Sequence, residues 1–248
     1  MMVFKLNKFL ILLVYFLASL YLQSEESLVV KNEYKPVVNE IIEILDQNHF
    51  KKNIVINEQK VIDNFLVNID KEKIVFTSVE FNSYKASFKN IYNLEEIFKI
   101  YRDYSDRTLE LINYQKDVVD LIDTSADLNT TEFVEKSRED EKRFNSLGSI
   151  KNYHALLIKN EFINILLSNN NFENSKSKLL KRLKNRVKSL KRIKSDDIFS
   201  LYINSITSLY DPHTNYLSPK SQEDFEINMS LSLEELEQFY PQRMELLK

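Results

Sequence analysis

Apolar residues recur every three or four positions over most of this chain, which is the spacing of amphipathic α-helices. The clearest stretches cover residues 36–50, 57–68, 93–119, 150–167 and 175–194. The pattern predicts an all-α fold, an irregular array of about eight helices that pack by their apolar faces behind an N-terminal signal segment.

Polar residues suited to cap helices stand before several of these stretches. After a short extended link, Thr77 or Ser78 can cap a helix that extends through Phe88. A serine cap at Ser195, followed by two acids, is expected to begin another helix that reaches Tyr210. These signals set the expected boundaries of two helices.

Residues 120–145 have a weaker pattern than their neighbours. Thr130 or Thr131 is a candidate to open a helix there. Its apolar positions would be Phe133, Val134 and Phe144. Gly148 is expected to mark a break before the next helix.

The composition excludes several kinds of active site. The chain has 248 residues, of which 43% are hydrophobic and 29% charged, so it is globular rather than disordered. Gly148 is its single glycine, which excludes a phosphate-binding glycine loop, a dinucleotide fingerprint and a nucleophile elbow. The absence of cysteine excludes disulfides, thiolate ligands and a lipid-modified cysteine anchor.

The start of the chain has the order of a secretory signal. Lys5 and Lys8 precede an apolar run over residues 9–22, and polar residues 23–27 follow. The run is shorter than the roughly 20 residues that a membrane-spanning helix needs. We therefore expect residues 1–24 to be a signal peptide or an uncleaved anchor, with export to the periplasm and membrane contact only through this segment.

The candidate chemical groups do not assemble into a recognisable site. His49, His154 and His213 stand far apart, and none has the spacing of a metal-binding motif such as His-Glu-x-x-His. Each is expected to be a structural or surface residue. The sequence assigns no catalytic residue, no metal ligand and no cofactor.

Lysines and arginines crowd residues 176–194. The other helices are rich in acids, and the net charge of the chain is −3, so a nucleic-acid partner is disfavoured. We expect a solvated basic face or one that pairs with acids of another domain.

Two segments near the C-terminal end carry a distinctive motif. Asp211-Pro212 is expected to stop one helix, and Ser218-Pro219 to restart a short one with proline at its first position. The first segment comprises Asp211, Pro212, His213, Thr214, Asn215, Tyr216, Leu217, Ser218 and Pro219. The second comprises Met229, Ser230, Leu231, Ser232, Leu233 and Glu234.

These segments, in this order, resemble the tail-specific (C-terminal processing) proteases of Gram-negative bacteria, in which they lead into a PDZ domain. The resemblance extends over residues 31–234 and is strongest from Ser195. It implies that residues 31–210 form a helical N-terminal domain and that residues 211–234 form a structural connector.

The resemblance also implies what the full-length family does. Its members are periplasmic serine endopeptidases with a PDZ domain that recognises apolar C-terminal tails of protein substrates and a Ser-Lys dyad. Those parts follow the region present here, so no catalytic residue is carried over. In some members the helical region docks an adaptor lipoprotein.

After Glu234 the chain departs from the family pattern Gly-Ile-Gly-Ala-Val-Leu. Codons can be chosen for residues 235–242 such that one additional G before them shifts the reading frame. In the shifted frame they encode this family sequence. We therefore expect residues 235–248 to be a frameshifted, loosely packed tail, a hypothesis that sequencing the locus tests.

Three hypotheses of function remain open from the sequence. The favoured one is a truncated, non-catalytic scaffold and docking region of a protease. The second is an intact serine endopeptidase whose sequence is cut by a sequencing frameshift. The third is an exported helical binding or adaptor protein unrelated to proteolysis.

Overall fold

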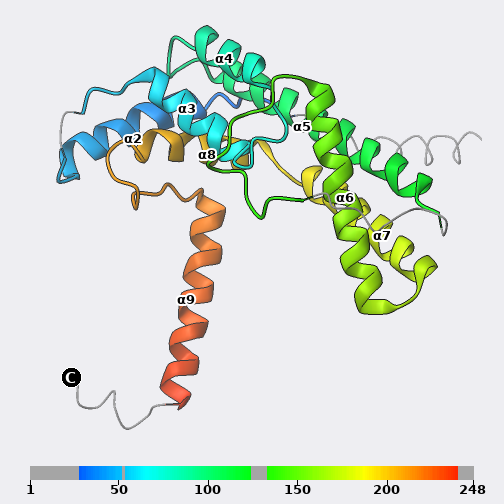
Figure 1. Ribbon diagram of the computed structural model, residues 1–248. Helices are drawn as coiled ribbons and strands as arrows, with labels where there is room; N and C mark the ends of the chain where they lie inside the picture. Colours follow the sequence, from blue (N-terminus) through cyan, green and yellow to red (C-terminus); the bar gives the residue numbers. More distant parts are fainter. Residues whose placement is uncertain (1–27, 52–53, 124–132, 240–248) are drawn as a thin grey trace, which may run out of the picture.

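The computed structural model describes residues 28–51, 54–123 and 133–239. Within these ranges it contains eight α-helices and no β-strand, so the predicted all-α array is confirmed (Figure 1). The helices are α2 (Tyr34–Asn48), α3 (Glu58–Ile69), α4 (Ser78–Ser87), α5 (Leu94–Leu121), α6 (Leu147–Asn169), α7 (Phe172–Leu190), α8 (Ser195–Thr207) and α9 (Pro219–Phe239). None of these helices is both long enough and apolar enough to cross a lipid bilayer. The expected signal segment, residues 1–24, lies outside the described residues.

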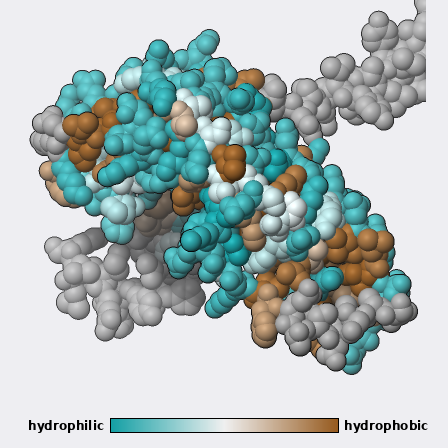
Figure 2. Space-filling view, turned by 45° about the horizontal axis from the view of Figure 1, so that its top comes forward, coloured by the Kyte–Doolittle hydropathy of each residue, from teal (hydrophilic) through white to brown (hydrophobic). Residues whose placement is uncertain are grey.

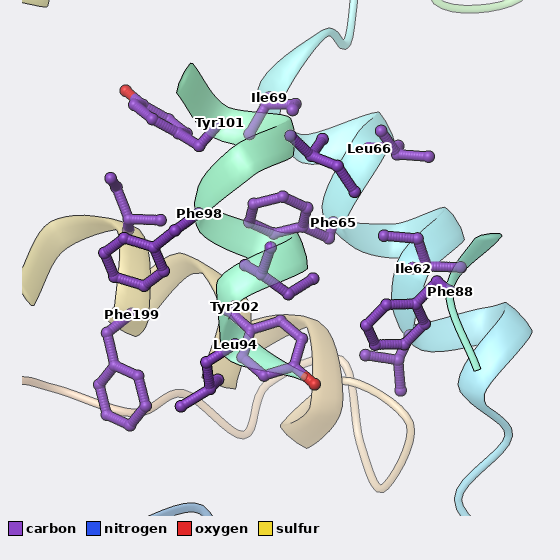
Figure 3. Close-up of a cluster of buried hydrophobic side chains, with 14 of the residues drawn as sticks. Ile62, Phe65, Leu66, Ile69, Phe88, Leu94, Phe98, Tyr101, Phe199 and Tyr202 are labelled. Atoms are coloured by element: carbon purple, nitrogen blue, oxygen red, sulfur yellow. The ribbon is translucent and has the colours of Figure 1, made fainter. Parts of the chain in front are cut away.

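Most of the molecule packs around one large hydrophobic cluster, here called the first cluster. It has 23 buried apolar side chains, drawn from the chain between Tyr34 and Ile206. Figure 3 shows how side chains from α3, α5 and α8 converge at its centre. There Phe65 and Tyr202 meet edge to face with ring centroids 6.1 Å apart. Burial of these side chains is the main stabilising contribution to the fold.

A smaller second cluster lies between the C-terminal half of α5 and the helices α6 and α7. Its buried side chains are Ile112, Val119, Ile122, Ile158, Phe162, Ile165, Leu179 and Leu183. Helices α6 and α7 form a hairpin that stands beside the main body (Figure 1). Asn170 makes the turn with φ at 51°, a left-handed conformation that asparagine tolerates. Asn171 then caps α7 by accepting the N–H of Asn174 at 2.8 Å.

Helix α4 begins with a reciprocal capping box. The Thr77 hydroxyl accepts the N–H of Glu80 at 3.3 Å, and the Glu80 carboxylate accepts the N–H of Thr77 at 2.9 Å. This arrangement satisfies two amides that a helix start leaves open. The predicted cap is confirmed, with Thr77 rather than Ser78 in that position.

The prediction of a helix in the middle stretch was wrong for its described part. Residues 133–146 contain no helix. Phe133 is 92% exposed, whereas Phe144 packs against the first cluster. Thr130 and Thr131, the candidate caps, lie outside the described residues.

Two arginines explain why this stretch is not helical. The Arg143 guanidinium reaches the buried carboxylate of Asp70, and the Arg138 guanidinium lies 4.1 Å from the centre of the Phe144 ring. Arg138 also donates to the backbone oxygen of Lys142 at 2.9 Å. The contact with the distant Asp70 and the two contacts within the stretch fix an irregular backbone that a weak local helical pattern does not outweigh.

The expected break at Gly148 was also wrong. Gly148 lies in the first turn of α6, and the break precedes it. Ser146 caps this helix by accepting the N–H of Ser149 at 3.1 Å. The cap residue, rather than the glycine, sets the boundary.

Helix α8 begins at Ser195 as predicted, but Ser195 is not its cap. Lys194 occupies the cap position, and the Asp197 carboxylate accepts its N–H at 2.8 Å. The Ser195 hydroxyl instead accepts the N–H of Val29 at 3.0 Å, so a tertiary contact uses the group expected to cap the helix. The helix ends at Thr207, before the predicted end at Tyr210.

Candidate functional site

The first motif segment forms an irregular loop between α8 and α9, and side chains of α8 hold its backbone. The Asn204 amide accepts the N–H of Tyr216 at 2.6 Å and donates to the oxygen of the same residue at 3.3 Å. The Thr207 hydroxyl donates to the backbone oxygen of Thr214 at 2.7 Å. The loop is therefore fixed against α8 at two of its residues.

The same loop opens with an aspartate turn. The Asp211 carboxylate accepts the N–H of His213 at 2.8 Å, and its backbone oxygen accepts the N–H of Thr214 at 3.0 Å. Pro212 occupies the next position, where its fixed φ favours a turn. His213 and Asn215 are exposed, and the Asn215 amide donates to the His213 oxygen at 3.4 Å.

The end of the loop joins the hydrophobic core to α9. The Tyr216 ring meets Phe199 edge-on at a centroid distance of 6.0 Å, whereas Leu217 is 47% exposed. The Ser218 hydroxyl accepts the N–H of Ser221 at 3.2 Å. Pro219 is the first residue of α9, which confirms its predicted place.

The second motif segment lies within α9, which is longer than the predicted short helix. Met229, Ser230, Leu231 and Ser232 are all exposed. The helix passes Glu234 and continues through Phe239, because the leucine and glutamate residues in 231–238 are strong helix formers. The side chains of Leu233 and Glu234 lie outside the description. Figure 1 shows α9 projecting from the body, so the two motif segments do not form one site.

An ion-pair cluster lies beside this loop, at the start of α8. The Asp196 carboxylate accepts from the Lys31 ammonium at 2.8 Å and from the Tyr34 hydroxyl at 2.6 Å. Hydrogen bonds from Lys31 and Tyr34 hold the pKa of the Asp196 carboxyl below its ordinary value. Burial and the bond to Asp196 raise the pKa of Tyr34. The cluster fastens residues 31–34 to α8 next to the motif loop, in a pocket of about 560 Å³ that Tyr216 also lines.

A larger hollow, here called the cleft, lies where the two hydrophobic clusters meet. Its volume is about 1240 Å³. It is bounded by residues 68–75, which include the end of α3, by one face of α5, and by the hairpin of α6 and α7.

A buried aspartate, Asp70, holds the backbone of one rim of the cleft in place. The Asp70 carboxylate accepts the N–H groups of Ile74 at 3.0 Å, Val75 at 3.2 Å and Phe76 at 3.0 Å. It also pairs with the Arg143 guanidinium. A buried carboxylate needs such partners to offset its desolvation, and they fix the path of residues 70–76.

Two buried polar side chains lie in the floor of the cleft. His154 Nδ1 and the Gln115 amide nitrogen are 3.1 Å apart, and His154 Nε2 lies 3.0 Å from the backbone oxygen of Ile74. Burial lowers the pKa of His154, although the hydrogen bond to Ile74 opposes this effect. A neutral ring that donates to Ile74 and accepts from Gln115 satisfies both contacts.

The three histidines occupy separate places. His154 has the structural role expected of it, whereas His49 approaches the Thr214 hydroxyl at 3.3 Å and His213 is exposed. Among residues 28–51, 54–123 and 133–239, no group of histidine and acidic side chains could hold a metal ion.

The basic residues predicted to crowd one element lie mainly on α7, and hydrophilic side chains cover most of the visible surface in Figure 2. Apolar residues gather at the far end of the α5–α7 lobe in the same view. Arg182 and Arg186 share one carboxylate, that of Glu161 on α6, at 3.1 Å and 2.7 Å.

The comparisons agree with the motif and the fold. A family model described as the tail specific protease N-terminal domain matches residues 41–220, well over half of the chain. The chain belongs to this family, and the resemblance stated from its sequence is confirmed. It is also 28% identical over 199 residues to a tail-specific protease of Haemophilus influenzae. That match covers 77% of this chain but only 28% of the relative, so most of the relative has no counterpart here.

The sequence did not reveal several residues that organise these sites. Asn204 and Thr207 follow one another at helical spacing on a mostly apolar helix, which was the available signal. Asp70 and Arg143 are separated by 73 positions, and no local pattern links them. Their pairing depends on the packing of the first cluster.

Proposed function

We propose that this chain is the non-catalytic helical scaffold and docking region of a tail-specific serine protease. Proteins of this family cleave substrates that carry apolar C-terminal tails, and the chemistry belongs to the part of the protein that follows such a region. The proposal rests on one observation, the match of residues 41–220 to the N-terminal domain model. The motif loop after α8 supports it, because the loop is anchored to the helical body and leads away through α9.

The first experiment tests for catalysis. The purified chain is incubated with casein and with a peptide that ends in an apolar tail, and the Haemophilus influenzae relative serves as the positive control. We expect no cleavage above the buffer blank. Turnover that a serine-directed inhibitor abolishes would refute a non-catalytic role.

The second experiment tests the scaffold role directly. Residues 41–220 of this chain replace the matching region in the Haemophilus influenzae relative, and cleavage by the chimera is measured. We expect the chimera to fold and to cleave the tailed peptide. The same chimera with Asp70→Ala is the control, since loss of the buried pair with Arg143 should destabilise its helical body and lower cleavage. A folded but inactive chimera counts against the proposal.

Export is part of the same proposal. The basic start and the apolar run over residues 9–22 favour it. Fusion of residues 1–30 to a reporter that is active only outside the cytoplasm should give signal. Replacement of Leu12 and Leu13 by arginine should abolish it, and an unchanged signal would contradict export through this segment.

A further inference from the structure

The cleft is a large feature of the described surface that the scaffold role does not use. Its volume of about 1240 Å³ exceeds the roughly 300–1,000 Å³ typical of small-molecule pockets. Its lining runs along three helices rather than around one point. This shape suits a chain-like ligand better than a compact one.

The two walls of the hairpin present polar side chains in helical register. The stripe from α6 consists of Asn160, Glu161 and Asn164, next to the apolar Leu157. The stripe from α7 consists of Arg182, Asn185, Arg186 and Ser189. Amide side chains both donate and accept, so these stripes match the alternating N–H and C=O groups of an extended polypeptide.

The floor of the cleft adds apolar contact and one amide with a spare acceptor. Ile74, Ile112 and Ile193 line it together with Gln115. Gln115 is 5% exposed, and its nitrogen is engaged with His154. Among the described residues no donor contacts its carbonyl oxygen, which is therefore available to a donor that enters the cleft.

The hairpin wall of the cleft has an excess of positive charge, whereas the opposite rim adds Asp70 and Glu72 against Lys71. Arg182 and Arg186 share the single carboxylate of Glu161. Each guanidinium has five N–H donors, and no other acceptor contacts either of them among the described residues. The rest of α7 strengthens the field, because it carries Lys181, Lys184 and other lysines against one acid, Glu173.

From these observations we infer that the cleft binds an extended polypeptide segment that carries acidic side chains. Arg182 and Arg186 pair with a carboxylate of the segment, the asparagine stripes bind its backbone, and the apolar floor takes the side chains between the acids. A nucleic acid fits less well, because of the two aromatic rings that line the cleft Tyr101 is only 6% exposed and Tyr104 is half-buried, which leaves little surface for base stacking. The inference rests on the proposed docking role and names the class of partner.

Binding can be measured on the full chain by fluorescence anisotropy. The probe is a labelled pool of peptides of about ten residues. Each peptide has Asp or Glu at every second position and Val, Thr or Leu between them, so that in an extended chain the acids lie on one face. A second pool carries Asn or Gln in place of the acids. We expect saturable binding of the acidic pool and at least about tenfold weaker binding of the neutral one.

Paired variants separate the cleft from general charge. R182Q/R186Q should weaken binding of the acidic pool about tenfold. K184Q/K188Q removes the same charge from the same helix, but neither lysine lines the cleft. Its effect should be small and should vanish in salt. Asn185→Trp, which blocks the cleft without a change of charge, should also weaken binding, and circular dichroism confirms that each variant folds.

Equal losses from the two charge variants would overturn the inference, since they would indicate only long-range attraction. Unchanged binding by Asn185→Trp would overturn it as well. So would a duplex oligonucleotide, or vesicles of anionic lipid, that bound with the same affinity and the same dependence on Arg182 and Arg186. If this chain binds the acidic peptides but the chimera is folded and inactive, only the proposed function is refuted. If the chimera is active but this chain binds no acidic peptide, only this inference is refuted.

Discussion

The first and second hydrophobic clusters are built in different ways. The first draws 23 buried apolar residues from helices and connecting loops between Tyr34 and Ile206, so it ties together segments that are far apart in the sequence. The second uses eight residues from α5 and its end at Ile122, from α6 and from α7. A larger core with more long-range contacts should need a higher free energy to open. The smaller lobe of α5, α6 and α7 can unfold locally while the rest of the molecule stays folded. The comparison therefore predicts that α6 and α7 are the less stable part, although they form the wall of the cleft.

The largest expected effect comes from the buried aspartate of the first cluster. Asp70→Ala removes the partner of Arg143 and the acceptor of three backbone N–H groups. We expect a loss of about 3–5 kcal/mol in the free energy of unfolding in urea. Asp63→Ala, which breaks only the half-buried pair with Lys85, should cost at most about 1 kcal/mol. Equal costs would show that the Asp70 network does not stabilise the first cluster.

A substitution in the second cluster should show whether the two clusters unfold independently. Leu183 is fully buried, and Leu183→Ala should cost about 3 kcal/mol. Hydrogen exchange should show lost protection in α6 and α7, with α3 and α8 still protected. Leu167→Ala, at a position 76% exposed, is the matched control. Equal loss of protection in α3 and α8 would mean that the clusters unfold as one unit.

The junction of the clusters should respond to acid through His154. Burial lowers the pKa of His154 below its ordinary value of 6.5, so below that pH the unfolded chain binds more protons than the folded one. Stability should therefore fall as the pH decreases from 7 toward 5. His154→Gln should have a smaller pH dependence of the urea midpoint over this range. A larger dependence in the variant would contradict a neutral buried ring.

The smallest expected effect is at the start of α4. Thr77→Ala removes the hydroxyl that accepts the Glu80 N–H and should cost about 1 kcal/mol. Ser78→Ala alters only an exposed contact with Asn145 and should cost less. The reverse order in thermal unfolding would identify Ser78 as the cap. Either result tests how much a local cap adds to the first cluster.

The sequence predicted the features that depend on neighbouring residues. Helices α3 and α5 follow from apolar spacing, and the start of α9 follows from Pro219, whose ring fits the first turn of a helix. The family followed from an ordered motif rather than from geometry. Gly148 was misjudged, because a glycine is tolerated in the first turn of a helix that Ser146 caps.

Only the tertiary structure decided how these elements meet. Asp70 and Arg143 pair across 73 positions, and Ser195 gives its hydroxyl to Val29 instead of to its own helix. Asn160 and Arg186 belong to stripes that look like ordinary solvated helix faces until the hairpin places them across one cleft. Helical periodicity is a local property that the sequence by itself determines. The partner of a polar side chain is chosen by packing, which brings distant segments together and penalises every buried charge left without one.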